Sequence, residues 1–575
     1  MDDAVTPRRM IRVRASRRQA LRLLALGSGA ALLAACGQQP PTPATAPAKP
    51  VEAANPTAAP AKPAEAAKPA EAVKPAAPVA AAQPTAAPPQ PAPPTTAPVV
   101  KPAAPTGKLT VSQNADPRSL WASSSTNIQE INYSEQISEK LMEFSPAGNE
   151  FEPRLATEWK QLDDTTLQLK LRQGVKFTNG EPFDAEAAKF SIGVMSNSAS
   201  LKAFTSVVTG ADVVDQYTIN VKTANPTLLH LPALAMGSFM YPPKLFQEIG
   251  QDEFGKKPVG TGPFVFSNWV KDSAVTFEAN DGYWGGVPGF KTLVMRTIPE
   301  DAARVAALET GEIDFLNDLA LPLINRVERA GTLQLHSIAS NRVWNLVPST
   351  VTDTPFKLAK VRQALWYALD VPALLKGLYQ GRGKALERQA VSEGYFGYTK
   401  GLQPTSYDPD RVKQLLTEAG HPNGFEFDFK LSAAHKELGQ AVASQLARVN
   451  LRARQEVLEP GTYLTMLSQL KLNDMRISGS LPPPDAHFQL LTFETGFRYS
   501  YYSNPAFDAL LKKGATTMNR DERQQTYADI AKLLEEDPPY APMFHLQDFY
   551  ASSKEITGYV PRVSQFMDLR TIKPA

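Results

Sequence analysis

The chain has 575 residues and a formal net charge of +2, from 60 Lys and Arg residues against 58 Asp and Glu residues. This length predicts two to four domains, because single hydrophobic cores rarely grow beyond roughly 250–300 residues. The charge is uneven: residues 1–35 carry +5, residues 37–106 carry +2 and residues 107–575 carry −5. The acidic main body gives no electrostatic reason to bind nucleic acid.

Residues 1–36 have the order of a secretory signal peptide. Seven arginines precede an uncharged apolar run, Leu23 to Ala35, and small residues lead to Cys36, the only cysteine of the chain. The run is too short to span a hydrocarbon layer of about 30 Å. A single cysteine also excludes an internal disulfide framework and a CxxC motif. We therefore expect export from the cytoplasm.

The segment LAAC, ending at Cys36, resembles the lipobox of bacterial lipoproteins. The resemblance implies lipidation of Cys36 and anchorage on the periplasmic or cell-surface side of the membrane, at about 0.8 kcal/mol per buried CH₂. Residues 16–22, with Arg17 and Arg18, resemble a twin-arginine export signal. Ala20 stands where phenylalanine is typical, so both the twin-arginine and the general route stay open.

Residues 37–106 are predicted to be a disordered linker. This stretch holds 20 of the chain's 50 prolines and almost no large apolar side chains. It cannot bury enough surface to offset the entropy of ordering. We expect a tether with a reach of roughly 50 to 200 Å. A core position for Cys36, the alternative to lipidation, is disfavoured because this linker follows it.

Helices and strands alternate in the body. Residues 166–172 alternate apolar and polar as a half-buried strand, and a helix that opens at Pro299 and stops at Gly311 leads into a strand at residues 313–315. Asp408 followed by proline predicts the start of a helix whose apolar face ends before Gly420.

Three more elements follow this helix. A strand at 425–429, a helical stripe at 438–449 and a strand at 456–458 are predicted in that order. A helix between two strands is typical of a crossover unit, in which the strands run parallel. The body is therefore predicted to have an α/β architecture.

Several separated motifs resemble the family 5 solute-binding proteins of ABC transporters, the peptide-, opine- and nickel-binding group. The resemblance runs from about Leu109 to about Val560. Its motifs are FEPRLATEW at 151–159, LRQGVKFTNGEPF at 171–183, PVGTGPF at 258–264, ALETGEID at 307–314, VRQALWYALD at 361–370, and YDP at 407–409 with EAG at 418–420.

The resemblance implies an α/β, two-lobed periplasmic-binding-protein-like fold of type II (cluster C-like), with mixed sheets and an interlobe cleft. We expect lobe I at 107–340, completed by 545–575, and lobe II at 341–544. The implied function is capture of a small solute, an oligopeptide by default, and its delivery to an ABC permease with its ATPase. We expect a monomer with no catalytic activity and no cofactor.

Two other functions remain open. A ligand-sensing or adhesive surface lipoprotein would use the same fold, and an anchored hydrolase would need a catalytic pair in the cleft. The body has no GxSxG motif, which disfavours a nucleophile elbow. None of the six histidines forms an HxH, an HxxxH or a pair with cysteine, so no metal site is predicted.

The ligand-binding residues are less well defined by the sequence. In peptide-binding relatives an acidic residue pairs with the ligand's amino terminus, and aligning the loop on Asp485 puts Pro482 at that position. Proline offers neither charge nor donor, which weakens the case for a free peptide amine. Asp485 is then a candidate substitute, or else a solvated loop carboxylate.

Four more candidates for the cleft are Trp344 with Asn345 in a strand-like stretch, and Tyr501 and Tyr502 beyond the Asp485 loop. Aromatic side chains stack on ligands and donate hydrogen bonds, but for each one alone the sequence favours core packing. Arg498 is a candidate for a ligand carboxylate, or for a salt bridge within the protein. The GTGPF loop is interpreted either as a sharp turn near the lobe crossing or as an ordinary loop.

Overall fold

The computed structural model describes residues 107–472 and 474–575. The predictions made for Cys36, Arg17, Arg18 and the linker at 37–106 lie outside the described residues. Among the helices that are described, none combines the length and the apolar character of a membrane span.

One mixed sheet runs through both lobes, in the order β16-β15-β17-β13-β18-β11-β1-β10-β9-β8, with β12 and β14 also paired to β18. Its strands in lobe I are β1 (Lys108–Gln113), β8 (Phe264–Val270), β9 (Ala274–Ala279), β10 (Thr292–Thr297), β11 (Phe315–Leu316) and β12 (Leu333–Ala339). Those in lobe II are β13 (Val343–Pro348), β14 (Gly383–Ala385), β15 (Phe425–Ser432), β16 (Leu451–Leu458) and β17 (Met475–Ser480). The strand β18 (Ala541–Ser553) belongs to both.

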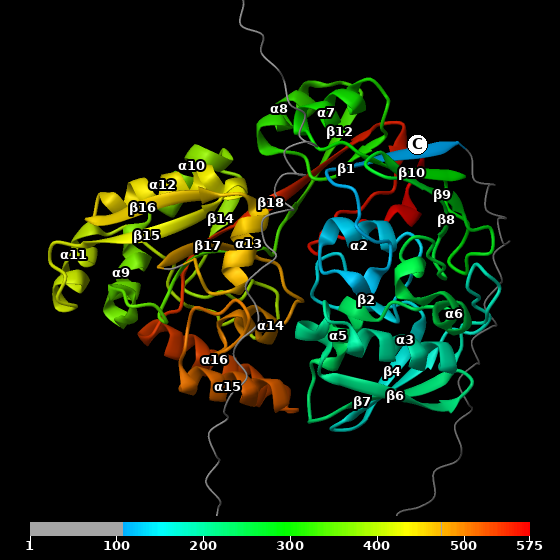
Figure 1. The fold of residues 1–575 in the computed structure, drawn as a ribbon, viewed down its shortest axis with the longest axis horizontal. Helices are drawn as coiled ribbons and strands as arrows, with labels where there is room; N and C mark the ends of the chain where they lie inside the picture. The colour runs from blue at the N-terminus through cyan, green and yellow to red at the C-terminus, as the bar shows by residue number, and fades with distance from the viewer. Residues whose placement is uncertain (1–106, 473) are drawn as a thin grey trace, which may run out of the picture. The chain divides into compact units, whose positions relative to one another are not determined.

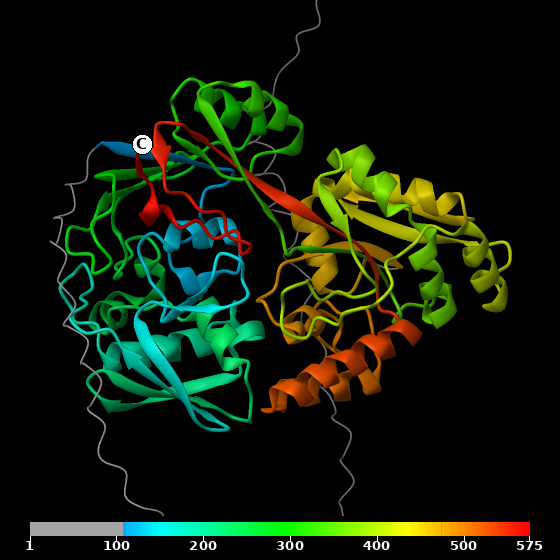
Figure 2. The same cartoon turned by 180° about the vertical axis from the view of Figure 1, so that it is seen from behind.

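The strand β18 is where the two lobes join (Figures 1 and 2). Its first residues pair with β13 and β14, and its last seven pair with β12. The chain also crosses between the lobes at Ser340–Arg342, between β12 and β13. Hydrogen bonds hold the two crossings together: Ser340 N donates to Leu546 O at 2.9 Å, and His545 Nδ1 lies 3.0 Å from Arg342 O. The crossings therefore form one hydrogen-bonded ribbon.

Lobe I has a second sheet, in the order β4-β5-β7-β6, with its own hydrophobic core. Its strands are β4 (Ala156–Asp163), β5 (Thr166–Leu171), β6 (Val208–Asp215) and β7 (Thr218–Thr223); the short pairs are β2 (Met142–Phe144) with β3 (Phe151–Pro153) and β19 (Ile556–Thr557) with β20 (Lys573–Pro574). The helices of this lobe are α2 (Ile128–Ser134), α3 (Ala185–Asn197), α4 (Lys202–Thr205), α5 (His230–Gly237), α6 (Pro243–Phe254), α7 (Asp301–Glu309) and α8 (Ile324–Arg329).

In lobe II the sheet separates two cores. The helices α9 (Ala359–Ala368), α10 (Val371–Tyr379), α11 (Pro409–Glu418) and α12 (Lys436–Ala447) pack on one side. The helices α14 (Ala486–Leu490), α15 (Pro505–Thr516) and α16 (Arg520–Glu536) pack on the other, and α13 (Pro460–Ser468) belongs to a smaller cluster. Leu346 faces the first core while Val343 and Val347 face the second, because neighbouring side chains of a strand point to opposite faces.

Most predicted elements are confirmed. Asp408 caps α11 by accepting from Arg411 N at 3.0 Å, and Gly420 after the helix has φ +83°. The strands β15 and β16 pair in parallel around α12, as a crossover unit requires. The helix ends at Ala447 rather than at residue 449, and β16 begins at Leu451, five residues before the predicted start.

The strand predicted at 313–315 is wrong in position, because β11 covers only Phe315–Leu316. Asp314 explains the shift: its Oδ2 accepts from Thr110 N at 2.7 Å, while its own backbone N donates to Thr110 O at 2.8 Å. The side-chain carboxylate of Asp314 thus accepts the hydrogen bond that a backbone carbonyl of a neighbouring strand would otherwise accept from β1.

The GTGPF loop needs its glycines for a close backbone approach. Gly262 N donates to Ile137 O at 2.7 Å, and a Cβ atom at Gly260 would lie 2.1 Å from the same oxygen. Thr261 is buried and its hydroxyl donates to Glu139 Oε2 at 3.1 Å. These contacts lie within lobe I.

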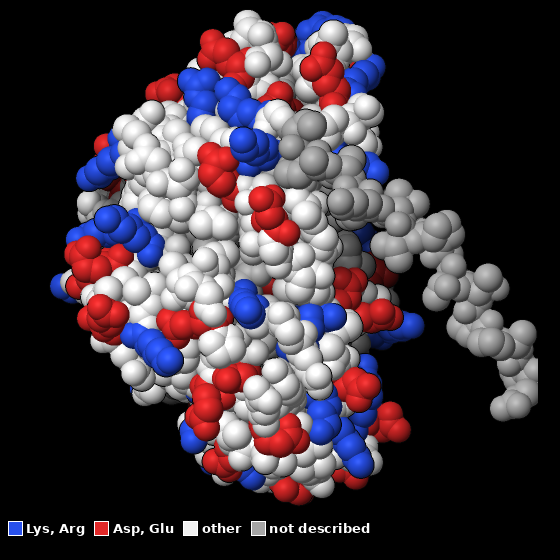
Figure 3. All heavy atoms as spheres, turned by 90° about the vertical axis from the view of Figure 1, so that its right-hand side faces the viewer, with Lys and Arg blue, Asp and Glu red and all other residues white. Residues whose placement is uncertain are grey.

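Acidic and basic side chains are interspersed over the face drawn in Figure 3. Both signs alternate there among uncharged residues, and neither sign forms a broad field on this face. A large single-sign surface is what steers polyanions such as nucleic acids, and this face does not provide one.

Candidate cleft between the lobes

Three adjoining cavities lie between residues of the two lobes. The hinge cavity, of about 280 Å³, shares Ile128 and Arg342 with the middle cavity, of about 160 Å³. The middle cavity shares Gly148, Tyr395 and Pro484 with the outer cavity, of about 390 Å³. Because neighbouring cavities have wall residues in common, they lie next to one another along the space between the lobes.

The hinge cavity lies at the crossing and contains three charged side chains: Asp318, Arg342 and Asp548. Burial lowers the pKa of Arg342, although both acids oppose this shift. Burial also raises the pKa of Asp318 and that of Asp548. The side chain of Asp318 is nevertheless exposed to solvent. It lies in the wall of the hinge cavity, where a solute could contact it.

Trp344 reaches the hinge cavity from β13. Its ring lies edge-on to His435 at 5.0 Å between centroids and contacts Gly479, where an added Cβ would lie 3.0 Å from the indole. The indole Nε1 is buried and finds no acceptor among the described residues. This nitrogen is a donor, and burying a donor without a partner costs free energy.

The middle cavity is mostly apolar. Among the described residues that form its wall, Arg342 is the only charged one. The remaining wall is formed by Thr126, Ile128, Phe144, Gly148, Met236, Tyr395, Leu481, Pro482, Pro483, Pro484, Val563, Ser564 and Phe566. Pro482, the position aligned with an amine-binding acid, therefore faces a cavity that has no carboxylate in its wall.

The outer cavity contains Asp485, which is 5% exposed and paired with Arg523. The Arg523 guanidinium donates to Oδ1 at 2.7 Å and to Oδ2 at 2.8 Å. Asp485 Oδ1 also accepts from His487 N at 2.9 Å and so caps α14. Burial acts to lower the pKa of Arg523, but attraction to Asp485 outweighs it and the pKa is raised.

The other predicted residues lie away from these three cavities. Asn345 follows Trp344 on β13, so it faces the core of α14–α16 rather than the cleft, and it is 3% exposed. Tyr501 accepts from Leu472 N at 3.0 Å, and Tyr502 donates to Asp537 Oδ2 at 2.7 Å. Arg498 is exposed and stacks on Tyr499, 4.2 Å from the ring centroid. The structure brings only Trp344 and Asp485 to the cleft.

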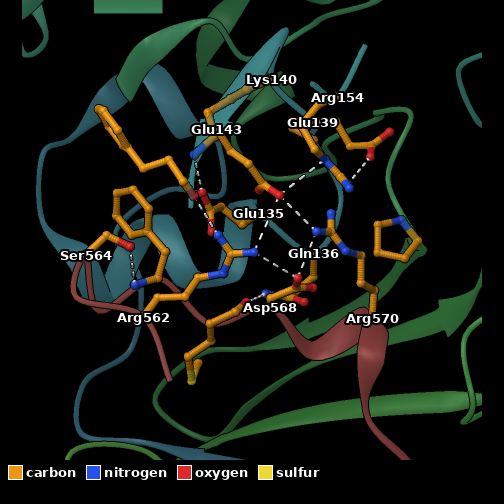
Figure 4. Close-up of a pocket in the computed structure, with 15 residues that line it drawn as sticks. Glu135, Gln136, Glu139, Lys140, Glu143, Arg154, Arg562, Ser564, Asp568 and Arg570 are labelled. Atoms are coloured by element: carbon orange, nitrogen blue, oxygen red, sulfur yellow. Dashed lines mark hydrogen bonds and ion pairs between the residues drawn. The ribbon is translucent and has the colours of Figure 1, made fainter. Parts of the chain in front are cut away.

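A separate, smaller cavity of about 40 Å³ in lobe I is filled with charge (Figure 4). Lys140 pairs with Glu135 at 2.5 Å, Arg154 with Glu139 at 2.6 Å, and Arg570 with Glu143 and Asp568 at 2.9 and 2.8 Å. Arg562 completes a set of four acids and four bases. Because every charge has a partner from this chain, we assign the cluster to fastening residues 562–570 onto α2 and β2.

Sequence patterns missed Asp318, Arg342 and Asp548. Arg342 stands two residues before Trp344 and next to the lobe boundary expected at 340–341, and this was the available signal. Asp548 lies on the second crossing, within β18. Within the described residues, no group of three or more His, Cys, Asp or Glu side chains is arranged to hold a metal ion.

Residues 150–500 match the family model of the bacterial extracellular solute-binding proteins, family 5. The chain belongs to this family. It is therefore an extracytoplasmic solute-binding protein of ABC importers rather than an enzyme, and the predicted two-lobed α/β fold is confirmed.

This solute-binding protein is 28% identical to heme-binding protein A of Haemophilus influenzae over 475 residues, which cover 74% of this chain and 85% of that protein. It is 29% identical to the glutathione-binding protein GsiB of Salmonella paratyphi A, covering 69% and 81%. The dipeptide-binding protein of Pseudoalteromonas sp. SM9913, solved with Met-Leu, superposes with a TM-score of 0.72 at 22% identity, covering 82% and 100%. That structural likeness supports the fold alone.

Proposed function

We propose that this protein is the lipid-anchored binding subunit of an ABC importer, and that it traps a peptide-like or similar small solute in the interlobe cleft. One observation carries the proposal: the three cavities have walls from both lobes, and the hinge and middle cavities both include Arg342 at the crossing. A solute in such a cleft touches both lobes only when they are together, so it favours the closed arrangement.

The proposed lobes are 107–340 with 545–575, and 341–544. The pairing of β12 and β13 with different halves of β18 supports these limits. The lobes also touch directly, since Thr227 Oγ1 donates to Ala515 O at 2.8 Å and the ring of Phe204 lies 6.0 Å from that of Phe488. Opening of the cleft would break both contacts.

We also propose that Cys36 carries the lipid, that 37–106 is the tether and that the protein acts as a monomer. The tether would keep the loaded protein near its permease and so raise its effective concentration there. Of the residues predicted from sequence, Trp344 is the one proposed to contact the solute, from the hinge cavity. Asp485 is proposed to support the outer cavity through Arg523.

Native mass spectrometry of the purified chain, followed by X-ray scattering with and without the solute it reveals, tests the proposal. We expect a co-purifying small molecule, compaction when it binds, and its release unchanged. A chemically altered solute would instead indicate a hydrolase. Binding in a strain whose import does not depend on the protein would indicate a sensing role.

The anchor has its own test. Cys36→Ser should release the protein from membranes without lowering its melting temperature. Membrane fractionation measures the release, and a variant that stays with the membrane would contradict the lipid anchor.

A further inference from the structure

The hinge cavity holds charges that do not neutralise one another through ion pairs. Arg342 donates to Gly479 O at 3.3 Å and to Gln565 Oε1 at 3.0 Å. Across residues 107–472 and 474–575, no carboxylate oxygen lies within 4.0 Å of its guanidinium. A guanidinium has five N–H donors, so most of its donors remain for another partner.

The two acids of this cavity are also only partly satisfied. Asp318 Oδ2 accepts from Asn114 at 3.2 Å. Asp548 Oδ2 is buried and has no hydrogen-bond partner among the described residues, and burial raises the pKa of this carboxyl group. Each carboxylate is therefore less well stabilised as an anion than it would be in water, and a cationic group between them would be bound favourably.

Trp344 gives an independent sign of a missing partner. Its buried Nε1 has no acceptor within the part of the chain that the structure describes, and its side chain forms part of the hinge cavity wall. Buried donors in native proteins are nearly always satisfied. This nitrogen has almost no accessible surface in the present arrangement, so an acceptor atom on a bound solute would reach it after the indole turns toward the cavity.

The adjoining middle cavity differs in chemistry. Arg342 is its only charged residue in the part of the chain that the structure describes, and apolar side chains such as Met236 and Phe566 form most of its wall. Arg342 therefore stands at the boundary between an acidic space and an apolar space. A solute that fills both spaces needs charged groups at one end and an apolar body at the other.

We propose that the cleft recognises a zwitterionic head with an apolar body, as in an α-amino-acid group bearing an apolar side chain. The cationic group would lie beside Asp318 and Asp548, the anionic group on Arg342, and the apolar body in the middle cavity. Arg presents paired N–H groups that match a carboxylate. This inference rests on the proposed function and names the class of solute.

Four compounds that share a phenyl group test separately how the cationic and the anionic group contribute to binding. They are L-phenylalanine with both charges, 2-phenylethylamine with the cation, 3-phenylpropanoate with the anion, and 3-phenylpropan-1-ol with neither. We expect L-phenylalanine to bind the full-length protein at least tenfold more tightly than each of the other three in titration calorimetry. Equal affinity for L-phenylalanine and either singly charged compound, or no binding of L-phenylalanine, would overturn the inference.

Variants of the protein test which residue binds each charged group of the solute. Arg342→Gln should remove the preference for L-phenylalanine over 2-phenylethylamine, and Asp548→Asn should remove the preference over 3-phenylpropanoate. The partly exposed Arg411→Gln and the exposed Asp410→Asn on α11 are matched controls that should keep both preferences. A preference that survives in Arg342→Gln, with melting temperature unchanged, contradicts the assignment.

Native mass spectrometry distinguishes this inference from the proposed function. A co-purified solute that none of the four compounds displaces would overturn the zwitterion inference and leave solute capture standing. If X-ray scattering shows no change with any co-purified solute, both fail.

Discussion

The buried ion pair of Asp485 and Arg523 gives a sharp test of how the outer cavity is built. Asp485→Asn keeps an oxygen for capping α14 but removes the charge opposite Arg523. Both residues are at most 5% exposed, and the guanidinium makes two hydrogen bonds to the carboxylate. Removing one partner of a buried pair leaves the other charge uncompensated, at roughly 3–5 kcal/mol.

The remaining contacts of Arg523 place the expected loss near the lower end. Its Nε still donates to Gly514 O at 2.7 Å, and Nη2 to the Tyr527 hydroxyl at 2.9 Å. We therefore expect Asp485→Asn to lower the free energy of unfolding by about 3 kcal/mol, and the melting temperature by about 3–7 °C. Urea unfolding followed by circular dichroism measures the first, and differential scanning fluorimetry the second.

Two further variants make this test specific. Asp521→Asn removes an exposed acid from the same cavity and should change stability by less than about 1 kcal/mol. Asp485→Asn combined with Arg523→Met should recover part of the loss, since no uncompensated charge remains. If Asp485→Asn is as stable as the wild type and loses its solute, Asp485 is a solute ligand and the structural argument fails.

Three other changes should affect stability in predictable directions. Gly260→Ala should destabilise lobe I by roughly 2–4 kcal/mol, because the new Cβ meets the Ile137 carbonyl. Tyr502→Phe should cost about 1 kcal/mol through its lost bond to Asp537, without weakening solute binding. Burial raises the pKa of Asp568 to about 6. Between pH 4 and 6 the carboxyl group of Asp568 therefore binds a proton more strongly in the folded state than in the unfolded state. The contribution of this group to the free energy of unfolding falls as pH rises through that range.

Each of these three predictions can be measured and can be contradicted by a specific result. Gly461→Ala, at a position with open space around it, should leave the urea midpoint nearly unchanged, and an equal effect of both glycine variants would rule out the steric cause. If calorimetry shows that Tyr502→Phe no longer binds the solute, Tyr502 is a ligand-binding residue after all. In urea unfolding curves recorded from pH 4 to 7, the free energy of unfolding of Asp568→Asn should fall less steeply with pH than that of the wild type. If the two proteins show the same dependence on pH, the raised pKa of Asp568 is contradicted.

The sequence predicted local features well because their causes are local. The cap at Asp408, the buried stripe of α11 and the left-handed Gly420 all lie within thirteen residues of one another. The pair β15 and β16 followed from a helix between two strands. Neither prediction needed a residue from elsewhere in the chain.

The hinge cavity could not be predicted in the same way, because its residues come from distant segments. Arg342 bonds to Gln565, 223 residues away, and Asp548 pairs with Ile338 only because β18 lies beside β12. Asp485 looked available in its loop because its partner Arg523 lies 38 residues further on. Alternation and capping patterns carry no information on such pairs.

The shared strand β18 has a consequence for the order of folding. Lobe I begins near Lys108, yet its sheet needs β18 beside β11 and β12, and Asn132 Oδ1 accepts from Met567 N, 435 residues later. A growing chain therefore makes all of lobe II before lobe I has its last strand. Closing so long a loop is slow, so the first-made half must wait, incomplete and open to proteases or chaperones, for the residues made last.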